Sequence, residues 1–99
     1  MASRLIWSPA ARLDLREIFE CIEADNPLAA RKFIRHLMQA VERLEEFPES
    51  GRIVPEFGVD VIREIIIPPC RIVYRLGDGN TTIEIVRIWH SARGIPDIQ

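Results

Sequence analysis

The sequence is poor in cysteine and contains no long hydrophobic run. Its two cysteines are Cys21 and Cys70, too few for the disulfide framework of a small secreted domain, so we predict free and mostly buried thiols. No apolar stretch approaches the ~20 residues of a transmembrane helix, and the N-terminus lacks the apolar segment of a signal peptide. These absences argue against a membrane protein and favour a cytoplasmic location.

Local motifs of enzyme chemistry are also missing. The chain has no glycine-rich phosphate loop, no Gly-x-Ser-x-Gly sequence and no residues at metal-ligand spacing. Its two histidines, His36 and His90, cannot form a structural zinc site by themselves. We therefore predict neither a metal nor a cofactor. We expect His36 on a helix surface, whereas His90 ends the last strand and is either a structural histidine or an acid or base near neutral pH.

Lysine is almost absent, and acids slightly outnumber bases. The formal net charge is −2, which argues against a protein whose whole surface grips nucleic acid. Lys32 is the only lysine, and the six bases after residue 50 are all arginine. Codon bias in a GC-rich genome would produce this composition, and so would selection for planar, bidentate recognition of anions.

The first half of the chain contains two helix-capping residues that are each followed by proline. Ser8 before Pro9, and Asn26 before Pro27, each predict a helix N-cap with proline at the first helical position. Apolar residues recur at helical spacing after both pairs, and the acids of the first helix, Asp14 among them, are expected on a solvated face. The link between the helices is so short that they must pack as an antiparallel hairpin.

Short strands account for most of the remaining sequence. The second helix is expected to end at about residue 46, before a loop over 48–58. Strands are expected at 5–7, 61–67, 71–76 and 81–90. The order β-α-α-β-β-β predicts a single α+β domain over 1–99, with a helical hairpin packed on a largely antiparallel four-stranded sheet. Apolar residues near the end of the last strand do not keep one phase, which indicates either cover on both faces or a β-bulge.

Arginines recur within these predicted strands. Strands seldom carry guanidinium groups unless a carboxylate, another anion or an aromatic ring meets them. Arg71 and Arg75 alternate with apolar residues, so we expect them on the face away from the helices. Cross-strand pairs with Glu64 or Glu84 would satisfy them, and an anion-binding surface is the alternative. The arginines concerned are Arg63, Arg71, Arg75, Arg87 and Arg93.

An ordered set of short motifs resembles the RelE/ParE superfamily of type II toxin–antitoxin toxins. In chain order they are Trp7-Ser8-Pro9-Ala10-Ala11, Asn26-Pro27-Leu28-Ala29-Ala30, Phe47-Pro48-Glu49-Ser50-Gly51-Arg52, Arg63-Glu64, Arg71-Ile72-Val73-Tyr74-Arg75 and His90-Ser91-Ala92-Arg93. The resemblance covers about residues 5–93. It implies a bacterial toxin in a hetero-oligomer with a cognate antitoxin, whose flexible segment folds over the toxin's helices and sheet.

The resemblance leaves two targets open. ParE-like members are not nucleases and poison DNA gyrase, whereas RelE-like and YoeB-like members cut mRNA in the ribosome by activating a ribose 2′-hydroxyl against the adjacent phosphate. That reaction needs a base, stabilisation of the phosphorane charge and an acid for the leaving oxygen. By resemblance to the YoeB-like pattern, Glu56 corresponds to the base, Arg71 to the phosphate-binding arginine and His90 to the terminal acid.

The chain departs from the nucleases in three features. Segment 48–58 has no lysine, no tyrosine follows His90, and the acidic net charge would weaken docking to a ribosomal site walled with phosphate. The Asn26-Pro27 link and the ending after His90 look more like ParE. We therefore predict a gyrase inhibitor whose strand arginines bind the antitoxin or the target. The alternatives are a ribosome-dependent endoribonuclease and a non-toxic family member that acts only as a binding partner.

Overall fold

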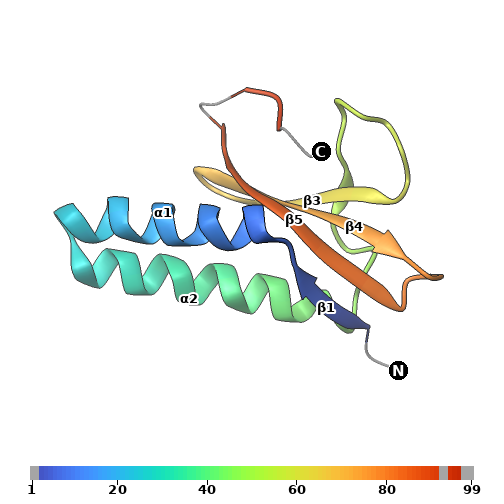
Figure 1. Ribbon diagram of the computed structural model, residues 1–99, viewed down its shortest axis with the longest axis horizontal. Helices are drawn as coiled ribbons and strands as arrows, with labels where there is room; N and C mark the ends of the chain where they lie inside the picture. Colours follow the sequence, from blue (N-terminus) through green and yellow to red (C-terminus); the bar gives the residue numbers. More distant parts are fainter. Residues whose placement is uncertain (1–2, 92–93, 97–99) are drawn as a thin grey trace.

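Two helices cover one face of a five-stranded sheet in the computed structural model, which describes residues 3–91 and 94–96 (Figure 1). The elements are β1 (Arg4–Trp7), α1 (Pro9–Asp25), α2 (Pro27–Arg43), β2 (Arg52–Ile53), β3 (Ile62–Ile67), β4 (Cys70–Gly77) and β5 (Thr82–His90). The strands lie in the order β1-β5-β4-β3-β2, with β1 parallel to β5 and the other pairs antiparallel.

The predicted α+β class and element order are confirmed, with one more strand than expected. The additional strand is β2, which pairs with β3 inside the segment that was expected to be a loop. Two residues are too few to show the alternation that reveals a strand in a sequence. The helix α2 also ends at Arg43, before the expected residue 46.

Both capping residues form the predicted helix starts. The hydroxyl of Ser8 accepts a hydrogen bond from the Ala11 amide at 3.0 Å and donates one to the Val86 carbonyl at 2.7 Å, which ties the start of α1 to β5. Asn26 ends one helix and begins the next. Its own amide donates to Ile22, and its side-chain oxygen accepts from the Ala29 amide. A single residue therefore reverses the chain, and the two helices run side by side (Figure 1).

The main core lies between the helices and the sheet. Leu37 and Val41 of α2, with Leu44 just after it, supply the helical side, and β3, β4 and β5 supply the strand side. The buried strand residues of this cluster are Ile67, Cys70, Ile72, Tyr74, Leu76, Ile83, Ile85 and Ile88. Cys70 is buried as expected, and burial raises the pKa of its thiol. Cys21 is exposed on α1, so the expectation that both thiols are mostly buried is wrong for this one.

A β-bulge in β5 resolves the broken alternation of its sequence. Val73 pairs with Arg87 and the next residue, Tyr74, pairs with Ile85, so Val86 is the extra residue. The shift lets Ile85 and Ile88 both face the helices although three positions separate them. Arg87 consequently points to the other face.

The buried phenol of Tyr74 fixes the chain between α2 and β2. Its hydroxyl accepts from the Gly51 amide at 2.9 Å and donates to the Pro48 carbonyl at 2.8 Å. Gly51 packs so closely that a Cβ there would lie 2.5 Å from the Tyr74 hydroxyl and 2.6 Å from the Glu64 carbonyl. No side chain larger than hydrogen fits without displacing one of these groups.

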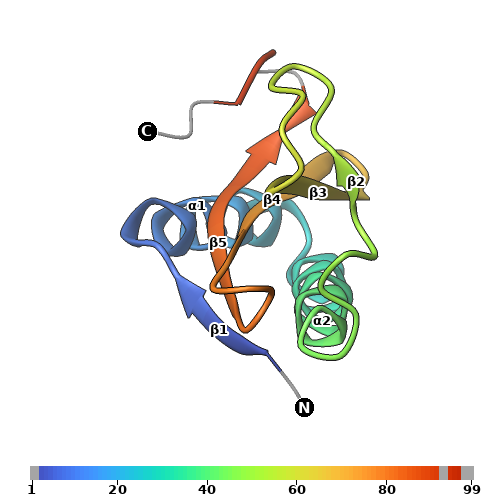
Figure 2. The ribbon, with the colours of Figure 1, turned by 90° about the vertical axis from the view of Figure 1, so that its right-hand side faces the viewer.

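The outer face of the sheet is covered as well. The 54–61 loop and residues 94–96 lie on the opposite side of the strands from α2 (Figures 1 and 2). Val54, Val73 and Pro96 are buried there. Under this cover Glu64 is fully buried, whereas the side chain of Glu56 remains partly exposed.

Candidate functional site

Arg71 on β4 is the centre of a charged cluster on the outer face. Its guanidinium donates to both carboxylate oxygens of Glu56 in the 54–61 loop, at 3.1 and 2.8 Å, and to Glu64 on β3 at 2.9 Å. It also reaches the Gly94 carbonyl at 3.3 Å. Only 11% of the Arg71 side chain is exposed. Arg71 therefore joins the loop and the C-terminal segment to the sheet.

Glu64 is fully buried and shared by two arginines. Arg71 holds one of its carboxylate oxygens, and the Arg52 guanidinium holds the other at 2.6 Å. A buried carboxylate is tolerated only when its charge is paired and its oxygens are hydrogen-bonded. The cross-strand pairing expected from the sequence is thus present here, and it recurs between Arg75 and Glu84 at 2.9 Å.

Electrostatics keep Glu56 ionised. Its hydrogen bonds to Arg71 are the largest cause of a pKa below the ordinary value of 4.5. Hydrogen bonds to Glu56 and to Glu64 in turn raise the pKa of Arg71. A carboxylate with a lowered pKa and both oxygens engaged is a weak general base, because proton transfer to it has little driving force near neutral pH.

His90 does not join this cluster. It lies opposite Cys70 in the β4–β5 ladder, and Cys70 faces the helices. The imidazole lines a cavity of about 160 Å³ together with α1 side chains that include Glu17 and Cys21. Arg71 is the next residue along β4 and points to the opposite face. Of the three residues assigned to the nuclease chemistry, two are in contact and the third lies across the sheet.

Arg87 and Arg63 also have partners within the molecule. Arg87 binds Asp14 of α1 through two nitrogens, at 2.7 and 2.8 Å, and lies 4.8 Å from the Trp89 ring. Asp14 also accepts from the Ile88 amide, and it is buried. The expectation of a solvated Asp14 is therefore wrong, because its carboxylate is buried against β5 and bonded to Arg87 and to the Ile88 amide.

Arg63 instead organises the chain around β2. Its guanidinium donates to the carbonyl groups of Glu49, Gly51 and Asp60. The remaining strand-end arginine of the prediction, Arg93, lies outside the described residues. The binding role of the five arginines stays a prediction, and four of them are engaged internally.

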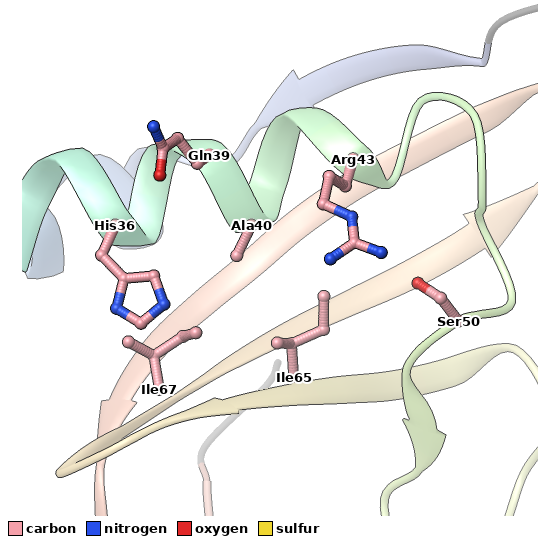
Figure 3. Close-up of a pocket in the computed structure, with 7 residues that line it drawn as sticks. All are labelled: His36, Gln39, Ala40, Arg43, Ser50, Ile65 and Ile67. Atoms are coloured by element: carbon pink, nitrogen blue, oxygen red, sulfur yellow. The ribbon is translucent and has the colours of Figure 1, made fainter.

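A groove lies between α2 and β3 (Figure 3). Its volume is about 460 Å³. The close-up shows Ile65 and Ile67 rising from β3 towards the side chains of α2. The lining residues are His36, Gln39, Ala40, Arg43, Ser50, Ile65 and Ile67.

The sequence motifs did not point to this groove. His36 was expected to have a plain surface role, and no role was expected for Arg43. The available signal was the charge of the second helix, which carries four bases against one acid between Pro27 and Arg43.

Residues 3–91 and 94–96 contain no group of three or more His, Cys, Asp or Glu side chains that could hold a metal ion. Among the same residues, neither helix is long and apolar enough to cross a membrane.

Comparison with known protein families decides the identity. Residues 5–95 match the family described as the ParE toxin of the type II toxin–antitoxin system parDE. This chain belongs to the ParE toxin family. It is a toxin of a type II toxin–antitoxin system, and the resemblance to the RelE/ParE superfamily is confirmed.

Individual relatives agree with this family. Toxin RelE2 of Caulobacter vibrioides is 36% identical over 92 residues, which cover 92% of this chain and 98% of that protein. Toxin ParE1 of Mycobacterium tuberculosis is 32% identical over 91 residues, which cover 91% of each.

Solved structures share the fold of this ParE family member. The chromosomal ParDE system from P. aeruginosa matches with a TM-score of 0.74 at 23% identity, over 90% of this chain and 96% of that chain. A mutant of the E. coli toxin RelE in the free state matches with a TM-score of 0.61 at 14% identity, over 95% of this chain and 88% of that chain.

Proposed function

We propose that this ParE family toxin inhibits DNA gyrase and is neutralised by a cognate antitoxin in a hetero-oligomeric complex. Gyrase and the antitoxin are cytoplasmic proteins, so the toxin acts in that compartment. The observation that carries the proposal is the charge balance at Arg71. Two carboxylates lie within 3.1 Å of its guanidinium, so no net positive charge is available there for a scissile phosphate.

The endoribonuclease alternative requires this cluster to be dismantled. A phosphate at Arg71 would have to displace Glu56 while remaining near the buried carboxylate of Glu64. A phosphate so close to the fully buried carboxylate of Glu64 would be repelled by its charge. The acid would also have to come from His90, on the other face of the sheet. A non-enzymatic target interaction needs neither rearrangement.

The net charge of the chain supports the same choice. A value of −2 provides no long-range attraction to ribosomal RNA, whose affinity for proteins depends on neutralised phosphates. A protein target such as gyrase does not impose this requirement. The third alternative, a family member without toxicity, predicts normal growth when the protein is expressed without its antitoxin, whereas a gyrase inhibitor predicts growth arrest.

The direct test is a supercoiling assay with purified toxin, gyrase, ATP and relaxed plasmid. We expect the toxin to abolish supercoiling at micromolar concentration and to lose this effect when the cognate antitoxin is added in equal amount. Full supercoiling at a large excess of folded toxin would refute the proposal.

A second arm separates the alternatives. Message bound to translating ribosomes is incubated with the toxin and mapped by primer extension, with His90→Ala in parallel. New 5′ ends that disappear in His90→Ala would support the endoribonuclease instead. Expression of the toxin without the antitoxin should arrest growth, and normal growth at a confirmed expression level would favour the non-toxic alternative.

A further inference from the structure

The first half of α2 presents a row of positive charge to the solvent. Arg31, Lys32 and Arg35 form this basic row, and all three are exposed. Within the described residues none of them takes part in an ion pair. The arginines of β3, β4 and β5 differ, because carboxylates or backbone carbonyls of this chain bind them. The fold therefore leaves the charge of the basic row available to a partner.

Helical spacing places the basic row on the side of α2 that faces away from the core. Arg31 and Arg35 are four residues apart, which is about 6 Å along the axis, and Lys32 lies beside them. The buried residues of α2, among them Leu37 and Val41, occupy the opposite side. Figure 2 views α2 nearly along its axis and shows the strands and α1 on one side of it. The basic row consequently points to solvent.

This arrangement is unfavourable for the helix itself. Arg31 and Arg35 are a like-charge pair four residues apart, and Lys32 and Arg35 are another three residues apart. Such pairs destabilise a helix. The first turn of α2 contains no acid, and none occurs between Pro27 and Val41. Charges that cost the helix stability, and that pair with nothing in the described chain, are typical of a binding surface for an anion.

The nearest acids do not neutralise the basic row. Glu42 lies seven residues beyond Arg35 on α2, about 10 Å along the axis, which is one Debye length at about 0.1 M salt. Glu23 and Asp25 lie at the end of α1, but no ion pair within the described residues joins the two helices. The positive potential is therefore local to the first half of α2, although the net charge of the chain is −2.

A nucleic-acid backbone matches the chemistry of the basic row. Guanidinium and ammonium groups both bind phosphate, and arginine does so through two hydrogen bonds. Phosphates follow one another at regular intervals along a strand, so cations on one side of a helix can bind several of them together. Contacts of this kind position a protein on the duplex without reading its sequence.

We propose that Arg31, Lys32 and Arg35 bind the phosphate backbone of the DNA that gyrase holds. The inference rests on the proposed inhibition of gyrase. Three phosphate contacts alone give weak binding, with Kd on the order of 100 µM. A toxin that is anchored on gyrase beside the DNA experiences an effective concentration of about 1 mM. The contact then strengthens inhibition by about tenfold, the ratio of this concentration to Kd.

One charge reversal tests the basic row, and a second is the matched control. Arg35→Glu removes the residue that belongs to both like-charge pairs. Because the new carboxylate would lie within one turn of Arg31 and Lys32, Tm should stay the same or rise while phosphate binding is lost. Arg12→Glu makes the same change of net charge on the exposed surface of α1, at the other end of the helical hairpin. Thermal unfolding verifies that both variants fold.

The first measurement is titration of a labelled DNA duplex of about 20 base pairs, followed by fluorescence anisotropy between about 20 and 200 mM salt. For the wild type the slope of log K against log salt should be about −2.7, because each of three neutralised phosphates contributes about −0.9. Arg35→Glu should raise Kd about tenfold and reduce the slope to about −1.8, whereas Arg12→Glu should change Kd by less than about twofold. An RNA duplex of the same length is titrated in parallel.

The second measurement is the toxin concentration that halves supercoiling by gyrase. Arg35→Glu should raise this concentration by about tenfold, and Arg12→Glu should leave it unchanged. Binding of the toxin to immobilised gyrase without DNA should be equal for the wild type and both variants. This third comparison separates a contact with DNA from a contact with gyrase itself.

Several results would overturn the inference. A wild-type slope near zero would show that the basic row does not bind phosphates. Unimpaired inhibition by Arg35→Glu would exclude the DNA on gyrase, and loss of RNA duplex binding in the same variant would then assign the row to RNA. Weaker binding of Arg35→Glu to gyrase without DNA would assign it to an acidic protein surface. Absence of inhibition by the wild type would instead refute the proposed function, and the inference with it.

Discussion

The close packing between Gly51 and Tyr74 allows a quantitative prediction. Tyr74→Phe removes a buried hydroxyl that accepts from the Gly51 amide and donates to the Pro48 carbonyl. Loss of one partner from buried hydrogen bonds costs about 1–3 kcal/mol. In a domain of this size about 2 kcal/mol lowers Tm by roughly 8–16 °C. The free energy of unfolding should fall accordingly in urea, with an unchanged m value.

Gly51→Ala perturbs the same contact from the other side. The new Cβ would lie 2.5 Å from the Tyr74 hydroxyl, 2.6 Å from the Glu64 carbonyl and 2.8 Å from the ring of Tyr74. Overpacking of a buried site costs about 1–3 kcal/mol and more where backbone must move. We expect the upper end of this range, because a carbonyl of β3 cannot rotate away as a flexible side chain can.

The double variant distinguishes this explanation from general fragility. Removal of the hydroxyl in Tyr74→Phe relieves one of the close contacts of the methyl group that Gly51→Ala introduces, but it leaves the contact with the Glu64 carbonyl. The pair should therefore be less destabilising than the sum of the single changes by about 1 kcal/mol. Strict additivity, or a Gly51→Ala protein within about 0.5 kcal/mol of the wild type, would refute the packing argument.

Three further predictions concern the charged clusters and the core. Asp14→Ala breaks the buried ion pair with Arg87 and should lower the free energy of unfolding in urea by about 3–5 kcal/mol. Glu20→Ala, on the exposed side of α1, should change it by no more than about 0.5 kcal/mol. Equal losses in the two variants would contradict the pairing. The Glu56 pKa is lowered below 4.5, so its ion pair stabilises the fold above that pH and is lost as the pH falls through the lower value. Glu56→Gln should therefore remove part of the acid dependence of unfolding as the pH falls below 4.5, and an unchanged profile would exclude this pair as its source. Leu37→Ala opens a cavity in the core and should cost about 2–5 kcal/mol by the same assay; a loss under about 1 kcal/mol would show that the site collapses around the smaller side chain.

Local signals in the sequence were sufficient for the helices and the order of the elements. Ser8-Pro9 and Asn26-Pro27 act within one helical turn, so their capping bonds form as predicted. The alternation of β4 likewise separated Ile72 and Tyr74 from Arg71. Each of these signals depends on neighbours in the chain, which a sequence displays directly.

Contacts between distant residues were harder to predict. Asp14 and Arg87 are 73 positions apart, and nothing in the sequence near either residue indicates that they meet. The bulge at Val86 left only a broken alternation in the sequence. The pairing of β5 with β4 likewise had to be known to place His90. It lies opposite Cys70, so it is on the other face of the sheet from Arg71, the next residue of β4. Both residues match a motif, but a motif does not show whether they meet.

By itself, the sequence determined the α+β fold, its membership in a toxin family and the need of the strand arginines for anionic partners. These properties depend on periodicity, capping and motif order, which are local or additive along the chain. Only the tertiary structure decided which arginines are neutralised internally and which charges remain for a partner. That outcome depends on register and on close approach between remote segments. A shift of one residue in β5 would exchange the faces of Arg87 and Ile88, and with them the surface that the protein presents.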